Sequence, residues 1–286
     1  MYTFHEGYQK TLGIDIKGIP GMTKGADAAV PMADLLSLKG KTAIVTGGAM
    51  GMGFCIVNRL CEAGAGVVIA DVADEYAEKA LEFFASRSYC VKYVKTDVRD
   101  PKQIEAAVAF TRKEFGSVDI LVNDAAVWSH RLLSEITEES FAEAVDVNLK
   151  GTLFFVQAVA KVMEEQGRGG KIINIASIAG LSNDPAPLMY EYVASKSGVI
   201  GVTKSLVRAL KPIGVNINCV VPGGMVTPGA VNTVRSEAAK ALKVPPCPVG
   251  DPDEVARVVY MLATEISSFM HGAVVAVDGG DLLHVL

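Results

Sequence analysis

A tyrosine and a lysine four residues apart could transfer a proton. Tyr192 and Lys196 belong to the segment Tyr-Val-Ala-Ser-Lys, and this spacing places both side chains on one face of a helix. A phenol has an ordinary pKa of about 10, and a nearby ammonium lowers that pKa toward the range of a useful base. Such a pair is often structural, but it permits general acid–base chemistry. Tyr190 has Ala194 at the same spacing, so we assign the chemistry to Tyr192.

Two further polar residues could assist this pair. Ser177 ends the apolar run 171–177. Because open α/β sheets bind ligands beyond the carboxyl ends of their strands, its hydroxyl could hold a substrate oxygen, or it could cap a turn. Asn148 lies in a stretch with helical spacing, where its amide could hold a water or a backbone group, or remain a locally bonded helix asparagine.

A glycine-rich segment, Thr-Gly-Gly-Ala-Met-Gly-Met-Gly at 46–53, follows the apolar run 42–46 and precedes a predicted helix at 54–63. Glycine permits a tight turn and a close approach of the backbone to a ligand. The free N–H groups at the start of a helix favour a pyrophosphate. An ordinary glycine-rich turn is the alternative, but the position between strand and helix favours dinucleotide binding.

An acidic residue, Asp71, ends the second apolar run, 66–71. A carboxylate at this place accepts hydrogen bonds from the ribose hydroxyls of the adenosine half and repels a 2′-phosphate. Ala49 and Met50 supply no basic side chain in the glycine segment. These features favour NAD over NADP, and the alternative is that Asp71 caps the following helix.

Short apolar runs alternate with helix-like segments from residue 41 onward. Near-continuous apolar strands indicate burial on both faces, and therefore a parallel sheet covered by helices. Asp100-Pro101 and Asp251-Pro252 each combine a capping residue with a first-turn proline, which predicts two helix starts. The pattern predicts an α/β fold, a Rossmann-like doubly wound sheet with helices on both faces. The predicted strands are 42–46, 66–71, 89–97, 118–124, 171–177, 215–222 and 273–280.

The chain length of 286 residues fits one or two domains. Residues 1–38 are rich in glycine and contain two prolines, without a sustained apolar period. We expect them to form an N-terminal extension outside the main fold, either loose or packed on a neighbouring subunit. Residues 39–286 are predicted to form a single dinucleotide-binding catalytic domain.

Composition excludes several other classes of function. The net charge is −5, and no basic stripe supports nucleic-acid binding. No apolar run reaches the roughly 20 residues of a membrane span, and the N-terminus lacks the pattern of a signal peptide. The five cysteines form no Cys-x-x-Cys pair and the four histidines show no ligand spacing. We therefore expect a cytoplasmic protein without a metal site, a nucleic-acid partner or a membrane partner.

Taken together, these segments resemble the short-chain dehydrogenase/reductase family over about residues 38–280. The resemblance implies a sheet of seven mainly parallel strands and hydride transfer between NAD and a small-molecule substrate. One departure concerns cofactor geometry: the usual Asn-Asn-Ala-Gly reads Asn-Asp-Ala-Ala, and the extra methyl group restricts the backbone. The resemblance is carried by residues 46–53, Asp71, Asp97-Val98, 123–126, Asn148, Ser177, 192–196 and Pro222-Gly223.

The resemblance also implies roles for individual residues. Tyr192 is the general acid/base, Lys196 lowers its pKa and binds the nicotinamide ribose, Ser177 positions the reacting oxygen, and Asn148 supports a relay water. The implied cofactor contacts are Thr46, Gly47, Gly51, Met52 and Gly53 in the loop, Asp71, Asp97, Val98 and Asn123 around the adenosine half, and Pro222, Gly223 and Thr227 beside the nicotinamide.

The substrate is expected to be a secondary alcohol or ketone, such as a polyol, a sugar acid or a cyclic alcohol. The alternatives are reduction of a 3-oxoacyl thioester and a non-catalytic NAD-binding regulator. A homotetramer is implied, with subunit faces from 101–115, 140–165 and 192–212. The expected pocket residues are mostly apolar: Val127, Trp128, His130, Ala179, Leu181, Met189, Met225 and Val226.

Overall fold

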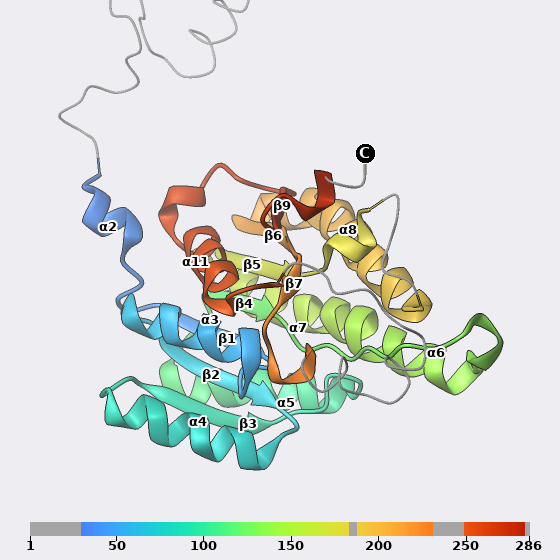
Figure 1. Ribbon diagram of the computed structural model, residues 1–286. Coiled ribbons are helices and arrows are strands. Elements are labelled where there is room, and N and C mark those ends of the chain that lie inside the picture. Colours follow the sequence, from blue (N-terminus) through green and yellow to red (C-terminus); the bar gives the residue numbers. More distant parts are fainter. Residues whose placement is uncertain (1–29, 183–187, 231–248, 284–286) are drawn as a thin grey trace, which may run out of the picture. The chain divides into compact units, whose positions relative to one another are not determined.

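The computed structural model describes residues 30–182, 188–230 and 249–283 (Figure 1). The chain divides into two units, Met1–Leu36 and Ser37–Leu286. The described part of the first unit contains one short helix, α2 (Met32–Leu36). Most of the expected N-terminal extension therefore lies outside the described residues.

A seven-stranded sheet forms the centre of the second unit, in the order β3-β2-β1-β4-β5-β6-β9. Every pairing in it is parallel. β1 pairs with both β2 and β4, so the strand order reverses at this point, and a doubly wound sheet opens its ligand crevice there. The strands are β1 (Thr42–Thr46), β2 (Gly66–Asp71), β3 (Val91–Lys95), β4 (Ile120–Asn123), β5 (Gly170–Ile175), β6 (Val215–Pro222) and β9 (Val274–Val277).

Each predicted strand overlaps a strand of the sheet. The predicted runs 42–46, 66–71 and 215–222 coincide with β1, β2 and β6. The runs 89–97, 118–124, 171–177 and 273–280 extend beyond β3, β4, β5 and β9. Composition therefore marks the strands better than it marks their ends.

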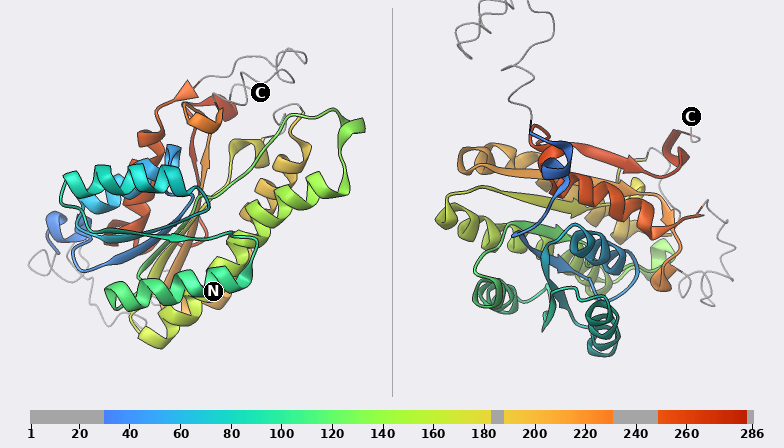
Figure 2. Two further views of the ribbon diagram at one scale, coloured as in Figure 1. Left: turned by 90° about the horizontal axis from the view of Figure 1, so that it is seen from below. Right: turned by 90° about the vertical axis from the view of Figure 1, so that its left-hand side faces the viewer.

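Helices cover both faces of the sheet, which confirms the predicted doubly wound α/β fold. α3 (Gly51–Glu62), α4 (Asp74–Ser86) and α11 (Pro252–Ala263) lie on one face, and α5 (Pro101–Phe115), α7 (Thr152–Gln166) and α8 (Tyr190–Leu210) on the other (Figure 2). Each layer buries its own apolar cluster against the strands. The first includes Ile56, Leu60, Phe84 and Val259, and the second includes Ile104, Val108, Phe155 and Met163.

Two helices begin at the predicted caps. The Asp100 carboxylate accepts a hydrogen bond from Lys102 N at 2.9 Å at the start of α5. The Asp251 carboxylate accepts one from Asp253 N at 2.9 Å at the start of α11, and the Glu254 carboxylate accepts one from Asp251 N at 3.3 Å. A cap of this kind stabilises a helix by about 1 kcal/mol.

Shorter elements connect the main ones. α6 (Glu138–Val145) continues through a π-helical turn, η3 (Asp146–Gly151), into α7. The 3-10 turns are η2 (Leu133–Glu135), η4 (Ile178–Gly180), η5 (Lys211–Ile213), η6 (Glu265–Ser267) and η7 (Asp281–Leu283), and β7 (Gly224–Met225) pairs with β8 (Val249–Gly250).

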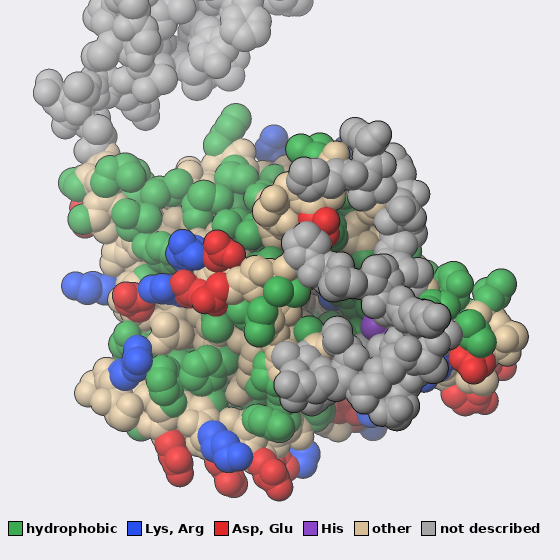
Figure 3. Space-filling view, viewed as in Figure 1, with side chains coloured by type: hydrophobic (Ala, Val, Ile, Leu, Met, Phe, Trp, Pro, Cys, Tyr) green, Lys and Arg blue, Asp and Glu red, His purple; other side chains and the backbone are tan. Residues whose placement is uncertain are grey.

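The outer surface of the first helix layer is strongly charged. Blue and red side chains gather over α3 and α11 (Figure 3), where Arg59 forms ion pairs with Glu62 at 2.6 Å and Asp253 at 2.7 Å. Among the described residues, no helix is both long and apolar enough to span a bilayer.

Candidate active site

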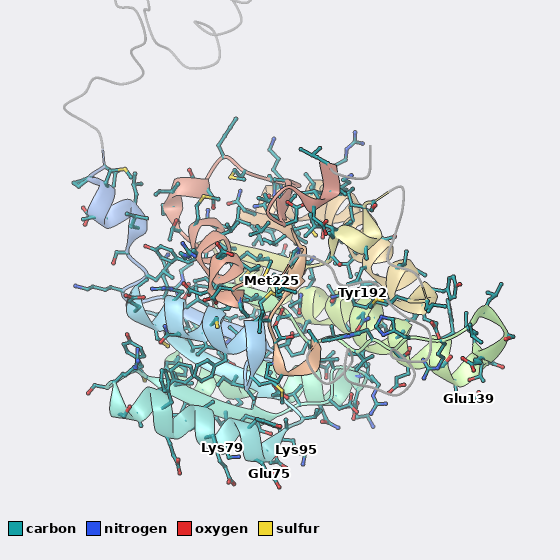
Figure 4. All side chains as sticks on the ribbon, viewed as in Figure 1. Glu75, Lys79, Lys95, Glu139, Tyr192 and Met225 are labelled. Carbon is teal, nitrogen blue, oxygen red and sulfur yellow. The ribbon has the colours of Figure 1, made fainter. Side chains whose placement is uncertain are left out.

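The predicted site residues gather at the carboxyl ends of the central strands. Thr46 ends β1, Pro222 ends β6, and Ser177 follows β5 by two residues. Figure 4 labels Tyr192 on α8 and Met225 on β7, which immediately follows β6. Parallel strands deliver these residues to one edge of the sheet, where ligands bind in this class of fold.

The Lys196 side chain is buried on α8, one turn after Tyr192. Its ammonium Nζ donates a hydrogen bond to the Ile175 carbonyl at 2.8 Å and lies 5.7 Å from the centre of the Tyr192 ring. Burial lowers the pKa of Lys196 to about 8, and the negative charge of Asp124 opposes that change. Lys196 can therefore change protonation near neutral pH.

The Tyr192 phenol differs from expectation in the direction of its pKa. Burial raises the pKa to about 12, a hydrogen bond with Ser177 lowers it, and the charge of Asp124 raises it further. The expected lowering by Lys196 is wrong for this structure, because that ammonium is directed to the Ile175 carbonyl. Burial thus favours the protonated form of the Tyr192 phenol.

Ser177 caps a turn and lies beside the Tyr192 phenol. Its hydroxyl accepts a hydrogen bond from Ala179 N at 3.1 Å at the start of η4. The same side chain hydrogen-bonds to Tyr192. Capping and proximity to the phenol are compatible, since a hydroxyl has one donor and two acceptor positions.

Asn148 is fully buried in the π-helical turn, and its amide is occupied by protein groups. Oδ1 accepts from Val127 N at 2.8 Å, while Nδ2 donates to Val127 O and Ser195 Oγ, both at 2.9 Å. Ser195 Oγ in turn donates to Tyr192 O at 2.7 Å. The amide therefore joins the segment after β4 to α8, and the relay water expected at Asn148 stays a prediction.

Two glycines of the turn at 46–53, Gly47 and Gly53, leave no room for a side chain. Gly47 has φ +68°, and a β-carbon there would lie 2.9 Å from Ala125 Cα. A β-carbon on Gly53 would lie 2.2 Å from the Gly47 carbonyl oxygen. Thr46 Oγ1 accepts hydrogen bonds from Asp124 N and Ala125 N at 3.0 and 3.1 Å, which fixes the turn against the end of β4.

The first turn of α3 is suited to bind an anion. Its N-cap residue, Met50, makes no side-chain capping bond, so the initial N–H groups depend on other acceptors. Thr227 lies beside this turn, since a β-carbon on Gly51 would be 3.5 Å from Thr227 Cβ. The residues present therefore fit a dinucleotide whose pyrophosphate lies at the turn.

Asp71 lies at the end of β2 with its carboxylate directed toward the turn. Oδ2 accepts from Ala49 N and Oδ1 from Ala73 N, each at 3.0 Å. The N-cap of α4 is Ala73, so Asp71 does not occupy the capping position that was the alternative. A carboxylate has about four acceptor positions, and two of them remain for ribose hydroxyls.

The other adenosine-side predictions differ in outcome. The Asp97 carboxylate pairs with Arg99 at 2.6 Å, and Val98 packs against Gly151. The Asn123 side chain is buried inside the sheet, where Nδ2 donates to Asn174 Oδ1 at 2.9 Å. The Asn123 side chain therefore joins β4 to β5, and the expected contact of Asn123 with the adenosine half stays a prediction.

The structure brings some of the residues expected in the substrate pocket close to one another. The Trp128 ring centre lies 6.2 Å from that of Tyr192, and a β-carbon on Gly229 would touch Trp128 at 2.7 Å. His130 has a buried Nδ1 without a hydrogen-bond partner, and burial lowers its pKa. The remaining residues are Ala179, buried beside Ser177; Leu181, 40% exposed; Met189, the N-cap of α8; Met225, packed on β8; and Val226, exposed.

Sequence reasoning missed several contacts that hold the candidate site residues in place. The Val127 backbone and Ser195 hold Asn148, and the Ile175 carbonyl holds Lys196. Ser195 offered a signal, since it lies one turn after Tyr192 in the same segment. Backbone partners leave no such signal, because any residue type supplies a carbonyl.

Comparisons with known proteins agree with this geometry. The family model described as enoyl-(acyl carrier protein) reductase matches residues 47–281. Galactitol 2-dehydrogenase of Agrobacterium fabrum is 36% identical over 86% of this chain and 99% of its own length. The 3-oxoacyl-[acyl-carrier-protein] reductase FabG of Thermotoga maritima is 32% identical, with the same coverage.

A solved structure gives the same result. The crystal structure of a short chain dehydrogenase from Mycobacterium paratuberculosis bound to NAD superimposes with a TM-score of 0.79 at 27% identity, covering 86% of this chain and 99% of that one. The glycine turn, the Tyr192–Lys196 pair and these relatives lead to one conclusion: the chain belongs to the short-chain dehydrogenase/reductase family and is an oxidoreductase that acts on CH–OH groups.

Proposed function

We propose that the protein is an NAD-dependent dehydrogenase of a secondary alcohol, with residues 39–286 as one catalytic domain. The observation that carries the choice of NAD is Asp71, whose carboxylate lies at the end of β2 beside the glycine turn. A 2′-phosphate would meet this negative charge, and residues 47–53 contain no basic side chain to compensate it. A structural relative described as bound to NAD supports the same choice.

The residues around Tyr192 perform the proton transfer in this proposal. The nicotinamide cofactor supplies the hydride acceptor or donor when it is bound. Ser177 holds the reacting oxygen by a hydrogen bond, and Tyr192 exchanges the proton with that oxygen. Lys196 binds the nicotinamide ribose and adds positive charge near the phenol. The proposed cofactor site consists of Thr46, the glycines of the turn, Met52, Asp71, Asp97, Val98, the Asn123 backbone, Pro222, Gly223 and Thr227.

The substrate is proposed to be a polyol or a related hydroxylated compound. A 36% identical relative is named for the oxidation of galactitol, and Trp128 with His130 would give the pocket both an apolar wall and a polar group. The second candidate is reduction of a 3-oxoacyl thioester, which the match to a reductase of that name favours. The net charge of −5 weighs against it, because acyl carrier proteins are themselves acidic.

A substrate panel tests these alternatives. Purified protein is offered NAD⁺ or NADP⁺ with galactitol, other polyols, sugar acids and cyclic secondary alcohols, and NADH or NADPH with a 3-oxoacyl thioester. We expect NADH formation from a hydroxylated substrate. Preferential NADPH oxidation by the thioester would replace the proposed substrate class, and tighter binding of NADPH than of NADH would contradict the role of Asp71.

We also propose a cytoplasmic homotetramer. A groove of about 810 Å³ runs between α5 and α7, with the apolar Val108, Phe154 and Ala158 in its lining. The charged lining residues Glu105, Arg112, Lys161 and Glu165 sum to zero charge, so two copies of this face do not repel each other strongly. Light scattering should give the mass of four chains, and a monomer would contradict the proposal.

A further inference from the structure

The Asp124 carboxyl group lies between the end of β4 and the glycine turn. Its backbone N–H donates to Thr46 Oγ1 at 3.0 Å. Its Oδ2 lies 2.9 Å from the position that a β-carbon on Gly53 would occupy, and the Gly53 backbone hydrogen-bonds to the carboxyl group. The carboxyl group is therefore packed against the first turn of α3, among the backbone groups that shape the proposed pyrophosphate site.

The second carboxyl oxygen is not satisfied. Asp124 Oδ1 is buried and has no hydrogen-bond partner. A buried ionised carboxylate is costly unless its oxygens are paired, and a proton on Oδ1 removes that cost. The hydrogen bond from Gly53 leaves this oxygen free to take the proton.

The groups that face Asp124 come from three elements. Asp71 lies on β2, Cys55 on α3, and Tyr192 and Lys196 on α8. Burial and Asp71 raise the pKa of Asp124 to about 7, while Lys196 and the Gly53 backbone lower it. The carboxyl group consequently exchanges its proton near physiological pH.

A bound pyrophosphate would add two negative charges to the same turn. An ionised Asp124 repels those charges and accepts a strong hydrogen bond from the Gly53 backbone, whereas a protonated Asp124 removes the repulsion and accepts only a weaker bond from that group. Burial under a ligand also removes water that screens this repulsion.

We propose that Asp124 carries a proton whenever the dinucleotide is bound, so that cofactor binding takes up one proton from solvent onto Oδ1. Asp124 is then a residue that determines cofactor affinity and makes it depend on pH. The inference rests on the proposed function in one respect, that the glycine turn binds a nicotinamide dinucleotide.

The proposal fixes the direction of the pH dependence. Below about pH 6 the free protein is already protonated at Asp124, and cofactor affinity is independent of this group. Above pH 7 each binding event must first add a proton, so the Kd rises by up to about tenfold per pH unit. The affinity for the cofactor therefore falls as pH rises. An ordinary carboxylate would cause no such change in this range, because it becomes ionised at a much lower pH.

Calorimetry measures the proton directly. NADH is titrated at pH 8 in two buffers with different enthalpies of protonation, and the difference in heat gives the number of protons bound. NADH is the suitable probe because it has no phosphate monoester that titrates in this range. We expect uptake of close to one proton by the wild-type protein, none by Asp124→Asn, and a Kd for that variant that does not change between pH 6 and 8.5.

Two controls separate Asp124 from its neighbours. Lys196 could also gain a proton near an anion, but Asp124→Asn retains this lysine. Proton uptake that persists in Asp124→Asn would therefore assign it to Lys196 and overturn the proposal. Asp74→Asn, which removes an exposed carboxylate paired with Lys95, should behave as the wild type.

A spectroscopic readout needs no variant. The infrared difference spectrum between NADH-bound and free wild-type protein at pH 8 should show a new protonated-carboxyl band, and its absence contradicts the proposal. If wild-type protein binds NADH without taking up a proton, this inference fails and the proposed function stands. If it does not bind NADH at all, both fail.

Discussion

Two aspartates at opposite ends of β4 have very different surroundings. Asp119, before the strand, accepts from Thr42 N at 2.9 Å and Ser117 Oγ at 2.8 Å, and pairs with Arg168 at 2.7 Å. Asp124, after the strand, has one oxygen without any partner. The amino-terminal end of the sheet has its buried carboxylate satisfied by the protein, whereas the carboxyl-terminal end leaves polar capacity for a ligand.

Two buried lysines repeat this contrast on β5 and α8. Lys171, near the start of β5, has Asn216 Oδ1 at 3.1 Å and the Glu265 carboxylate at 3.9 Å. Lys196 donates to a neutral carbonyl at 2.8 Å. Burial lowers the pKa of both, and a carboxylate restores part of it in each case, Glu265 for Lys171 and Asp124 for Lys196. Substitutions at the two ends should therefore separate stability from function.

The largest expected effect is at the carboxyl-terminal end of the sheet, where the candidate active site lies. Tyr192→Phe removes the proton-transfer hydroxyl, and turnover should fall by about 10²- to 10⁴-fold, as for loss of a general acid or base. NADH binding and the melting temperature should remain close to wild type, because the ring is retained. Tyr190→Phe is the matched control, since Tyr190 is exposed on the same helix. Wild-type turnover in Tyr192→Phe would remove the central residue of the mechanism.

The next largest effect is expected at the amino-terminal end of the sheet, where Asp119 lies. Asp119→Ala leaves the Thr42 N–H group without its acceptor and Arg168 without its partner. The free energy of unfolding should fall by about 2–4 kcal/mol, which urea denaturation measures. The kcat of protein that remains folded should not change. A fall in kcat with unchanged stability would reverse the comparison between the two ends.

The frame of strands and helix starts is the more predictable part of the molecule from sequence. β1, β2 and β6 were placed because their residues are apolar on both faces, and Asp100 and Asp251 were placed because a cap followed by proline is a local signal. The strand β3 was overextended, since composition marks a strand better than it marks its ends.

The residue types of the site were predictable from sequence, but the partners toward which their side chains point were less so. Asn123 bonds to a residue 51 positions away, and Asn148 to one 47 positions away. Such partners depend on the tertiary fold and leave no local pattern. The raised pKa of Tyr192 has the same origin, because the depth of burial is a property of packing.

A smaller effect tests the glycine turn itself. In Gly53→Ala the new β-carbon would lie 2.2 Å from the Gly47 carbonyl oxygen, so the turn must shift. We expect the Kd for NADH, measured by fluorescence, to rise at least about tenfold, a loss of about 1.4 kcal/mol. Gly201→Ala is the control, because a β-carbon there meets nothing within 4 Å and should stabilise α8 slightly. Equal cofactor affinity in both variants would show that the turn does not hold the ligand.

The smallest effect compares the two aspartates directly, through the pH dependence of stability. The Asp124 pKa of about 7 in the folded protein exceeds the value of about 3.9 expected when unfolded. The folded state therefore binds the proton more tightly, and wild-type stability declines as pH rises from about 4 through 7. Asp124→Asn has no such proton to lose, so its melting temperature should exceed that of the wild type at pH 8, with little difference near pH 4. Asp119→Asn should instead be destabilised at pH 8, because its carboxylate is paired. If both variants are destabilised equally at pH 8, the unpartnered oxygen of Asp124 carries no cost, and the two ends of β4 do not differ in the way described.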